Sequence, residues 1–180
     1  KNLGVEYVII GHSERRKYLG ETDEMINKKV LTTLKAGLKV ILCVGEPTQR
    51  GQTRTGRGLT RNIKWAKNYI KNQLEKDLKG ISKLLITNYQ LLIAYEPLWS
   101  IGTGHSDTPE DALEMIKFIK KILNTKYKLQ TTYVIYGGSV NSKNIADFLK
   151  HPEIDGALVG HASLKAGEVK KIIEIASKIV

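Results

Sequence analysis

A carboxylate at the end of an apolar run is the first group in this sequence that suits chemistry. Glu96 follows the apolar residues 91–94 and is flanked by Tyr95, Pro97 and Trp99. A carboxylate just beyond the C-terminal end of a strand lies where parallel-sheet enzymes place their active sites. Bulky neighbours limit its solvation, which raises the pKa of a carboxylic acid and suits it to take a proton from carbon. The alternative interpretation is an ordinary surface glutamate.

His12 is the second candidate. It follows the apolar residues 7–10, and the sequence Ser13-Glu14-Arg15 after it is typical of a helix start. A helix N-terminus disfavours a charged imidazolium, so we expect a neutral ring. A histidine at a strand end is otherwise usually a structural side chain. Cys43 lacks an activating partner in the sequence, and we expect it to pack in the core. No cluster of His, Cys or carboxylate residues has metal-ligand spacing, so no metal is predicted.

These residues belong to a repeating pattern of a short apolar run, a polar loop and an amphipathic segment. The runs cover residues 7–10, 40–44, 91–94, 133–136 and 157–159. Short runs without alternation are typical of parallel strands that are covered on both faces. Strands that alternate with helices predict a parallel α/β sheet in a single domain over residues 1–180. Periodicity does not separate a doubly wound sheet from part of a barrel.

Two helices have clear end signals. Residues 25–34 show helical apolar spacing and are followed by Gly37, which suits a C-cap. Thr108 and Pro109, followed by two acidic residues, are typical of an N-cap and a first helical turn. We expect the second helix to bury a stripe of apolar residues: Leu113, Ile116, Ile119 and Leu123.

Composition narrows the function classes. The 180 residues are 41% hydrophobic and contain no apolar run long enough to cross a membrane, and no signal peptide is visible. The only cysteine suits a reducing cytoplasm. Much of the net charge of +11 lies between Arg50 and Lys83. A nucleic-acid surface is one interpretation of this cluster, but the absence of a recognised motif favours a solvated helix face.

Three segments together resemble the triosephosphate isomerase family: residues 94–104 (AYEPLWSIGTG), residues 9–16 (IIGHSERR), and residues 136–140 (YGGSV) with 158–164 (LVGHASL). The resemblance covers the last five of the family's eight βα units. It implies an incomplete TIM-type (β/α) barrel with about five parallel βα units. It also implies an isomerase that interconverts dihydroxyacetone phosphate and glyceraldehyde 3-phosphate without a cofactor.

The resemblance also implies roles for individual residues. Glu96 shuttles the proton between adjacent carbons, His12 polarises the carbonyl, and Glu14 is the carboxylate that partners an active-site lysine. Residues 97–107 form a lid that excludes water. The residues implied in binding the triose phosphate, or a similar anion, are Gly102, Ser139, Leu158, Gly160 and His161.

The sequence departs from the family in three places. The lysine and asparagine that follow the family's first strand have no counterpart here. His161 stands where the family has a second glycine, and His105-Ser106-Asp107 replace the usual end of the lid. We therefore expect this isolated chain to be inactive or severely impaired. The alternative is a noncatalytic truncated homologue or assembly fragment. A partial barrel leaves open sheet edges, so we expect a homo-oligomer, most simply a twofold dimer.

Overall fold

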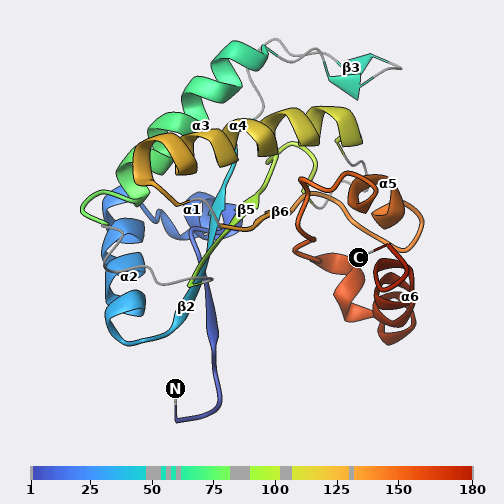
Figure 1. Ribbon diagram of the computed structural model, residues 1–180, viewed down its shortest axis with the longest axis horizontal. Coiled ribbons are helices and arrows are strands. Elements are labelled where there is room, and N and C mark those ends of the chain that lie inside the picture. The colour runs from blue at the N-terminus through green and yellow to red at the C-terminus, as the bar shows by residue number, and fades with distance from the viewer. Residues whose placement is uncertain are drawn as a thin grey trace.

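A four-stranded parallel sheet forms the centre of the molecule (Figure 1). The computed structural model describes residues 2–47, 54–55, 58–59, 62–81, 90–101, 107–129 and 132–179. The strands are β1 (Tyr7–Ile10), β2 (Lys39–Val44), β5 (Leu91–Tyr95) and β6 (Val134–Tyr136), and they lie side by side in this order. Four of the five expected strands are therefore present, each within one residue of its predicted position.

The fifth expected strand, over residues 157–159, is reduced to one parallel bridge between Ala157 and Tyr136. The backbone of Tyr136 donates to the Gly156 carbonyl at 3.0 Å and accepts from the Leu158 N–H at 2.8 Å. Among the described residues, no further strand pairs with residues 157–159 on the side away from β6. The sheet therefore ends at this single bridge. A two-residue antiparallel pair that the sequence did not suggest, β3 (Arg54–Thr55) with β4 (Gly58–Leu59), follows β2.

Two of the helices begin where a threonine side chain accepts one of their first N–H groups. Thr22 caps α2 (Asp23–Lys35), and Thr108 caps α4 (Pro109–Tyr127), whose first residue is the expected proline. The other helices are α1 (Ser13–Leu19), α3 (Ile63–Asp77), α5 (Ile145–Leu149), the 3₁₀ helix η1 (His161–Leu164) and α6 (Ala166–Ala176). Within the described residues, none of these helices is long and apolar enough to cross a membrane.

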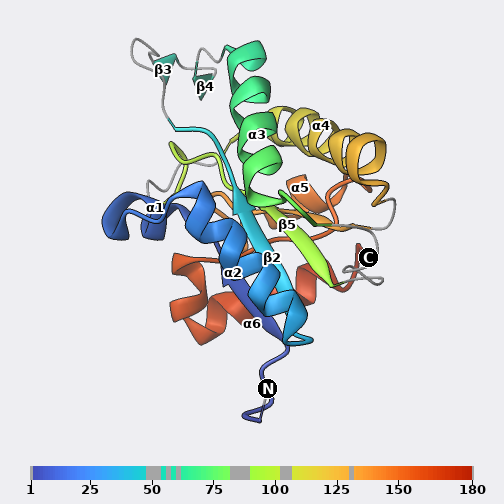
Figure 2. The same ribbon diagram turned by 90° about the vertical axis from the view of Figure 1, so that its left-hand side faces the viewer.

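One face of the sheet carries the large core. Strand register places Leu42 beside Ile93 and Val44 beside Tyr95, and the row continues to Tyr136. These side chains pack against α2, α3 and α4, which contact each other in sequence and lie along the sheet in both views (Figures 1 and 2). The consecutive helices therefore cover the same face, as the barrel architecture requires and a doubly wound sheet does not.

The opposite face has only a small cluster. Cys43, Ala94 and Ile135 lie side by side across three strands, with Ile41 and Leu158 partly buried against them. In a closed barrel, side chains from all strands fill this interior. Here the face is open at its β1 end, where Ile9 is 48% exposed.

Arg16 connects the carboxyl ends of the first two strands to the helices. Its guanidinium donates to the carbonyl of Gly11 at 2.9 Å and contacts that of Cys43 at 3.5 Å. It also pairs with Asp23 at 2.7 Å and with Asp77 at 2.5 Å. Since Gly11 precedes His12, this network fixes the backbone that carries the candidate histidine.

Asp77 makes stability depend on pH. Burial raises the pKa of this carboxyl from 3.8 to about 7, although the charge of Arg16 opposes the shift. The folded state therefore favours the neutral form of Asp77 over the carboxylate. This preference contributes fully to the free energy of unfolding below pH 3.8, and the contribution is lost as the pH rises through about 7. We expect Asp77→Asn to gain stability relative to the parent chain over this interval, by at most about 4 kcal/mol. Denaturant unfolding at a series of pH values measures the difference. Asp147→Asn, an exposed change on α5, is the control, and equal pH profiles for both variants would contradict the expectation.

Candidate active site

Glu96 lies directly after β5, and its side chain is on the open face of the sheet. The backbone N–H of Glu96 donates to the Val44 carbonyl at 2.8 Å, which continues the ladder with β2. Alternation along the strand places Ala94 and Glu96 on the same face and Tyr95 in the large core. The residue is only 1% exposed, so this carboxylate is almost completely removed from water.

His12 and Ser13 approach Glu96 from the end of β1. The Ser13 N–H donates to Glu96 Oε2 at 3.0 Å, and His12 Nε2 lies 3.2 Å from Glu96 Oε1. The second contact is close, but Oε1 accepts no properly oriented hydrogen bond from any residue that the structure describes. His12 is the N-cap of α1, where its Nδ1 accepts the Glu14 N–H at 3.3 Å. The expected helix start is confirmed, and the two candidates from distant parts of the sequence lie together.

Two glycines at the ends of the strands on either side of β5 leave room for Glu96. A Cβ at Gly45, which follows β2, would lie 1.7 Å from the Glu96 carbonyl oxygen. A Cβ at Gly137, which follows β6, would lie 2.9 Å from Glu96 Cγ. Real Cβ atoms do not approach so closely, so both positions require glycine for the observed packing.

The electrostatics of Glu96 result from opposing effects. Burial raises the pKa of its carboxyl, while His12, the Ser13 N–H and the Cys43 thiol partly offset the rise. The net shift is upward, as the bulky neighbours in the sequence indicated. Burial and the nearby Glu96 also raise the pKa of the Cys43 thiol well above its usual value, which favours packing over nucleophilic chemistry.

A cavity of about 670 Å³ lies over the open face at the carboxyl ends of the strands. It brings together seven of the eight residues that the resemblance implied: His12, Glu14, Glu96, Ser139, Leu158, Gly160 and His161. The eighth, Gly102, lies outside the described residues, as do residues 102–106 of the expected lid as a whole. Within the described chain, no group of three or more His, Cys, Asp or Glu side chains is arranged to hold a metal ion.

The individual residues occupy different positions in this cavity. Glu14 is exposed and forms no ion pair with the side chains that the structure describes. Leu158 contributes apolar wall and packs on the small cluster. His161 is the first residue of η1, and its φ angle is negative. Lys128 is the only described non-glycine residue with a positive φ angle. The glycine-to-histidine departure therefore does not strain the backbone.

Sequence reasoning missed several groups in the site. Ser13 and Gly137 lie within the motifs that carry the resemblance, but no role was assigned to either, because their roles depend on Glu96 lying against them in three dimensions. Lys165 and Glu168 also line the cavity. Lys165 follows the family-like segment 158–164 directly, and Glu168 comes three residues later. The residues just beyond this segment were therefore the available signal.

The Ser13 N–H offers a test of the electrostatics. Ser13 is the first residue of α1, a position where proline is well tolerated, so Ser13→Pro removes this donor without breaking the helix. The bond lowers the pKa of Glu96, and we therefore expect a higher pKa in the variant. Carbon-13 NMR of the Glu96 carboxyl measures the titration. Ser13→Ala, which keeps the N–H, is the control and should shift less; an unchanged or lower pKa in Ser13→Pro would refute the assignment.

Comparison with known proteins places this geometry in a family. A family model described as triosephosphate isomerase matches residues 1–176. The triosephosphate isomerase of Thermoanaerobacter pseudethanolicus is 46% identical over 177 residues, covering 96% of this chain and 66% of the relative. The chain thus spans slightly less than two thirds of that relative's length.

Two further relatives agree. The triosephosphate isomerase of Caldanaerobacter subterraneus subsp. tengcongensis is 46% identical over 176 residues, with 96% of this chain and 66% of the relative covered. That of Borrelia garinii subsp. bavariensis is 47% identical over 175 residues, with coverage of 95% and 64%. The matched region includes every motif that carried the resemblance, and the chain belongs to the triosephosphate isomerase family.

Proposed function

We propose that this chain carries the proton-transfer part of a triose-phosphate isomerase site. The reaction interconverts dihydroxyacetone phosphate and glyceraldehyde 3-phosphate. The observation that carries the proposal is the approach of His12 Nε2 to within 3.2 Å of Glu96 Oε1 at a cavity that also contains Ser139 and Gly160. A base and a polar donor beside one cavity suit proton abstraction next to a carbonyl group.

Glu96 is the base in this proposal. Its Oε2 is fixed by the Ser13 N–H, while Oε1 has no hydrogen bond from the described residues. The carboxylate takes a proton from the hydroxyl-bearing carbon beside the carbonyl and returns it to the former carbonyl carbon, while the hydroxyl proton passes from the oxygen on the first of these carbons to the oxygen on the second. The proton thus moves within one substrate molecule, and neither oxidation nor a cofactor is needed. The raised pKa of Glu96 makes it a stronger base than a solvated glutamate.

His12 is the proposed polar donor. Its Nδ1 accepts the Glu14 N–H, so in the neutral ring the proton is assigned to Nε2. Because His12 and Glu96 line the same cavity, an Nε2–H can donate to a substrate oxygen while Glu96 transfers the proton. This donor stabilises the negative charge that develops on the carbonyl oxygen.

The phosphate group of the substrate fits the other end of the cavity. The backbone N–H groups of Ser139, Gly160 and His161 donate to no acceptor in the described residues. Free backbone N–H groups bind anions well. Lys165 adds positive charge, whereas the carboxylate of Glu168 opposes it.

Low activity of the isolated chain is part of the proposal. The family resemblance calls for a lysine and an asparagine that have no match in this sequence, and Glu14, the implied partner of that lysine, forms no ion pair with the described side chains. Removing one preorganised donor or cation costs roughly 10²–10³ in turnover. The alternative is a relative of the same family that does no catalysis.

The remaining expectations concern the surroundings of the protein. Lys67 and Lys76 on α3 pair with Glu114 and Asp23, which supports a solvated helix face over a nucleic-acid surface. Cys43 is buried and free, which suits a reducing cytoplasm. We also propose self-association as a twofold dimer, because closed isologous contacts are the commonest in soluble oligomers.

Turnover is the first test. We expect the 180-residue chain to convert glyceraldehyde 3-phosphate to dihydroxyacetone phosphate at a rate equal to that of Glu96→Gln, which keeps the shape but not the base. A coupled assay at high enzyme concentration measures both. Fast turnover that disappears in Glu96→Gln would establish the isomerase and refute the low activity. Adding a polypeptide with the first three βα units of a relative should raise turnover of the parent chain but not of Glu96→Gln.

Phosphate binding is the second test. The Ser142 backbone N–H lowers the pKa of Glu168, so this cavity residue is a carboxylate at neutral pH. Glu168→Gln removes the charge and keeps the acceptor for Ser142, and we expect inorganic phosphate to bind a few-fold more tightly. Amide shifts of Ser139, Gly160 and His161 measure the affinity. Glu174→Gln on the same helix is the control because Glu174 does not line the cavity. An equal change in both variants would argue against phosphate in this cavity.

A further inference from the structure

Arg16 contacts backbone groups at the ends of β1 and β2, the strands from which His12 and Cys43 reach Glu96. Its Nε donates to the Gly11 carbonyl at 2.9 Å, and its Nη2 lies 3.5 Å from the Cys43 carbonyl. Gly11 has a φ angle of +78°, and a Cβ there would lie 3.2 Å from both Nη2 and the Cys43 carbonyl oxygen. The guanidinium therefore packs closely against the backbone that leads from β1 to His12.

One nitrogen of this guanidinium is shared between the backbone and a buried acid. Nη2 of Arg16 lies 2.5 Å from Oδ2 of Asp77, the last residue of α3, and also faces the Cys43 carbonyl. Asp77 is fully buried, and its Oδ1 accepts no hydrogen bond from any residue that the structure describes. Protonation of Asp77 removes its charge and most of its attraction for the guanidinium. The Cys43 carbonyl then has less competition for Nη2.

Four helices place charged or titratable groups around Asp77: Arg16 on α1, Asp23 on α2, Lys76 on α3 and Tyr127 on α4. Burial raises the pKa of the Asp77 carboxyl to about 7, against the opposing charge of Arg16. The charge of Asp23 raises this pKa further, whereas that of Lys76 lowers it. Burial, with a contribution from Asp77, raises the pKa of Tyr127 to about 12, so its phenol stays neutral. Asp77 therefore changes its charge at neutral pH.

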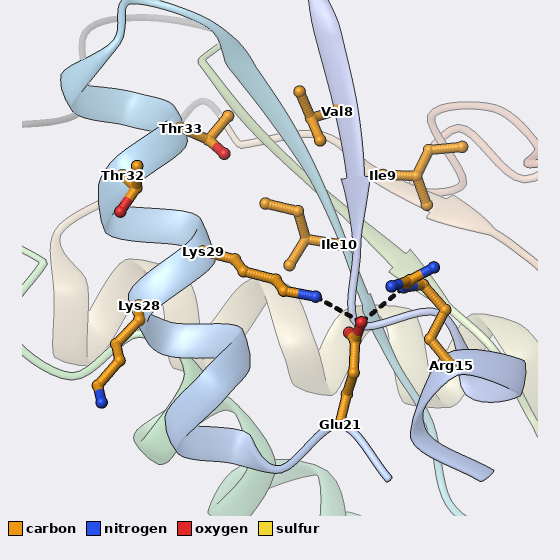
Figure 3. Close-up of a pocket in the computed structure, with 9 residues that line it drawn as sticks. All are labelled: Val8, Ile9, Ile10, Arg15, Glu21, Lys28, Lys29, Thr32 and Thr33. Atoms are coloured by element: carbon orange, nitrogen blue, oxygen red, sulfur yellow. Dashed lines mark hydrogen bonds and ion pairs between the residues drawn. The ribbon is translucent and has the colours of Figure 1, made fainter. Parts of the chain in front are cut away.

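The neighbouring arginine of α1 pairs with a different kind of carboxylate. Figure 3 shows Arg15 and Lys29 converging on Glu21, which is also buried. Burial raises the pKa of Glu21, but its two cationic partners outweigh burial, and the net shift is downward. Glu21 therefore stays ionised at neutral pH. Of these two acids, Asp77 is the one whose bond to an arginine changes strength in this range.

We propose that Asp77 and Arg16 form a proton-linked pair that sets the position of His12 and Ser13 at the site. When Asp77 is ionised, it draws the guanidinium toward α3. When Asp77 is neutral, the guanidinium moves toward the carbonyls at the ends of β1 and β2. The backbone that follows β1 moves with the guanidinium, and so do His12 and Ser13, which contact Glu96.

Arg16 and Asp77 act in this proposal as positioning residues, because neither is among the residues that line the cavity. The inference rests on the proposed function for its catalytic consequence. The proton-linked movement itself is measured by NMR on the 180-residue chain, without substrate and without turnover. Failure of the proposed catalysis and failure of this inference are therefore distinguishable.

An NMR titration across neutral pH tests the link between Asp77 and the site. We expect the carbonyl carbon of Gly11 and the amide of Ser13 to show a common step near pH 7 in the parent chain. The step should be lost in Asp77→Asn. It should persist in His12→Asn and in Glu96→Gln, which remove the other titratable groups beside these atoms. A step that survives in Asp77→Asn, or one that disappears in His12→Asn, would overturn the inference.

Two charge variants test the same link with Asp77 in place, and so remain informative if Asp77→Asn alters the fold. Asp23→Asn removes a carboxylate that raises the pKa of Asp77, so the step should move to lower pH. Lys76→Gln removes a cation that lowers this pKa, so the step should move to higher pH. Lys117→Gln, whose lysine pairs with Glu153, is the control and should leave the step in place. Shifts of the same sign in Asp23→Asn and Lys76→Gln would overturn the assignment of the step to Asp77.

Discussion

The burial of one carboxylate at the carboxyl edge of the sheet is the constraint on which the rest of this site depends. Glu96 is removed from water, and its Oε2 is stabilised by a single backbone N–H, from Ser13. That donor is at the N-terminus of α1, whose approach depends on Arg16 and on the carbonyls that Arg16 binds. Gly45 and Gly137 remain without side chains because any Cβ would occupy the space that Glu96 fills. The position of this one side chain thus depends on the strand ends, a helix start, an ion-pair network and two glycines.

The two faces of the sheet differ in how completely they are covered. Three consecutive helices bury one face, and its rows of large apolar residues supply most of the core. The other face has a cluster of only three small or medium residues, and the cavity lies above it. The candidate base on this face, Glu96, is buried by its neighbours along the edge and not by a filled interior. For this reason Glu96 is enclosed whereas His12, at the end of the outermost strand, remains partly exposed.

Sequence reasoning succeeded where the physics is local. The predicted helix starts at Ser13 and Thr108 depend on capping groups within a few residues, and four of the five apolar runs become strands within one residue of their predicted positions. The association of His12 with Glu96 came from family motifs, since no periodicity connects residues so far apart. Residues 157–159 form only a single bridge because their neighbour β6 has just three residues, and pairing takes place only at its last residue, Tyr136. The roles of Ser13 N–H and Gly137 were invisible because they arise only from the folded contact with Glu96.

The two candidate groups of the site are held with unequal firmness. Glu96 follows β5, which has β2 on one side and β6 on the other. His12 follows β1, which is hydrogen-bonded on one side only within the described sheet, and edge strands are less constrained than central ones. Arg16 partly compensates, because it binds the Gly11 carbonyl immediately before His12. The position of Glu96 therefore depends on the sheet itself, whereas that of His12 depends also on the contacts of Arg16.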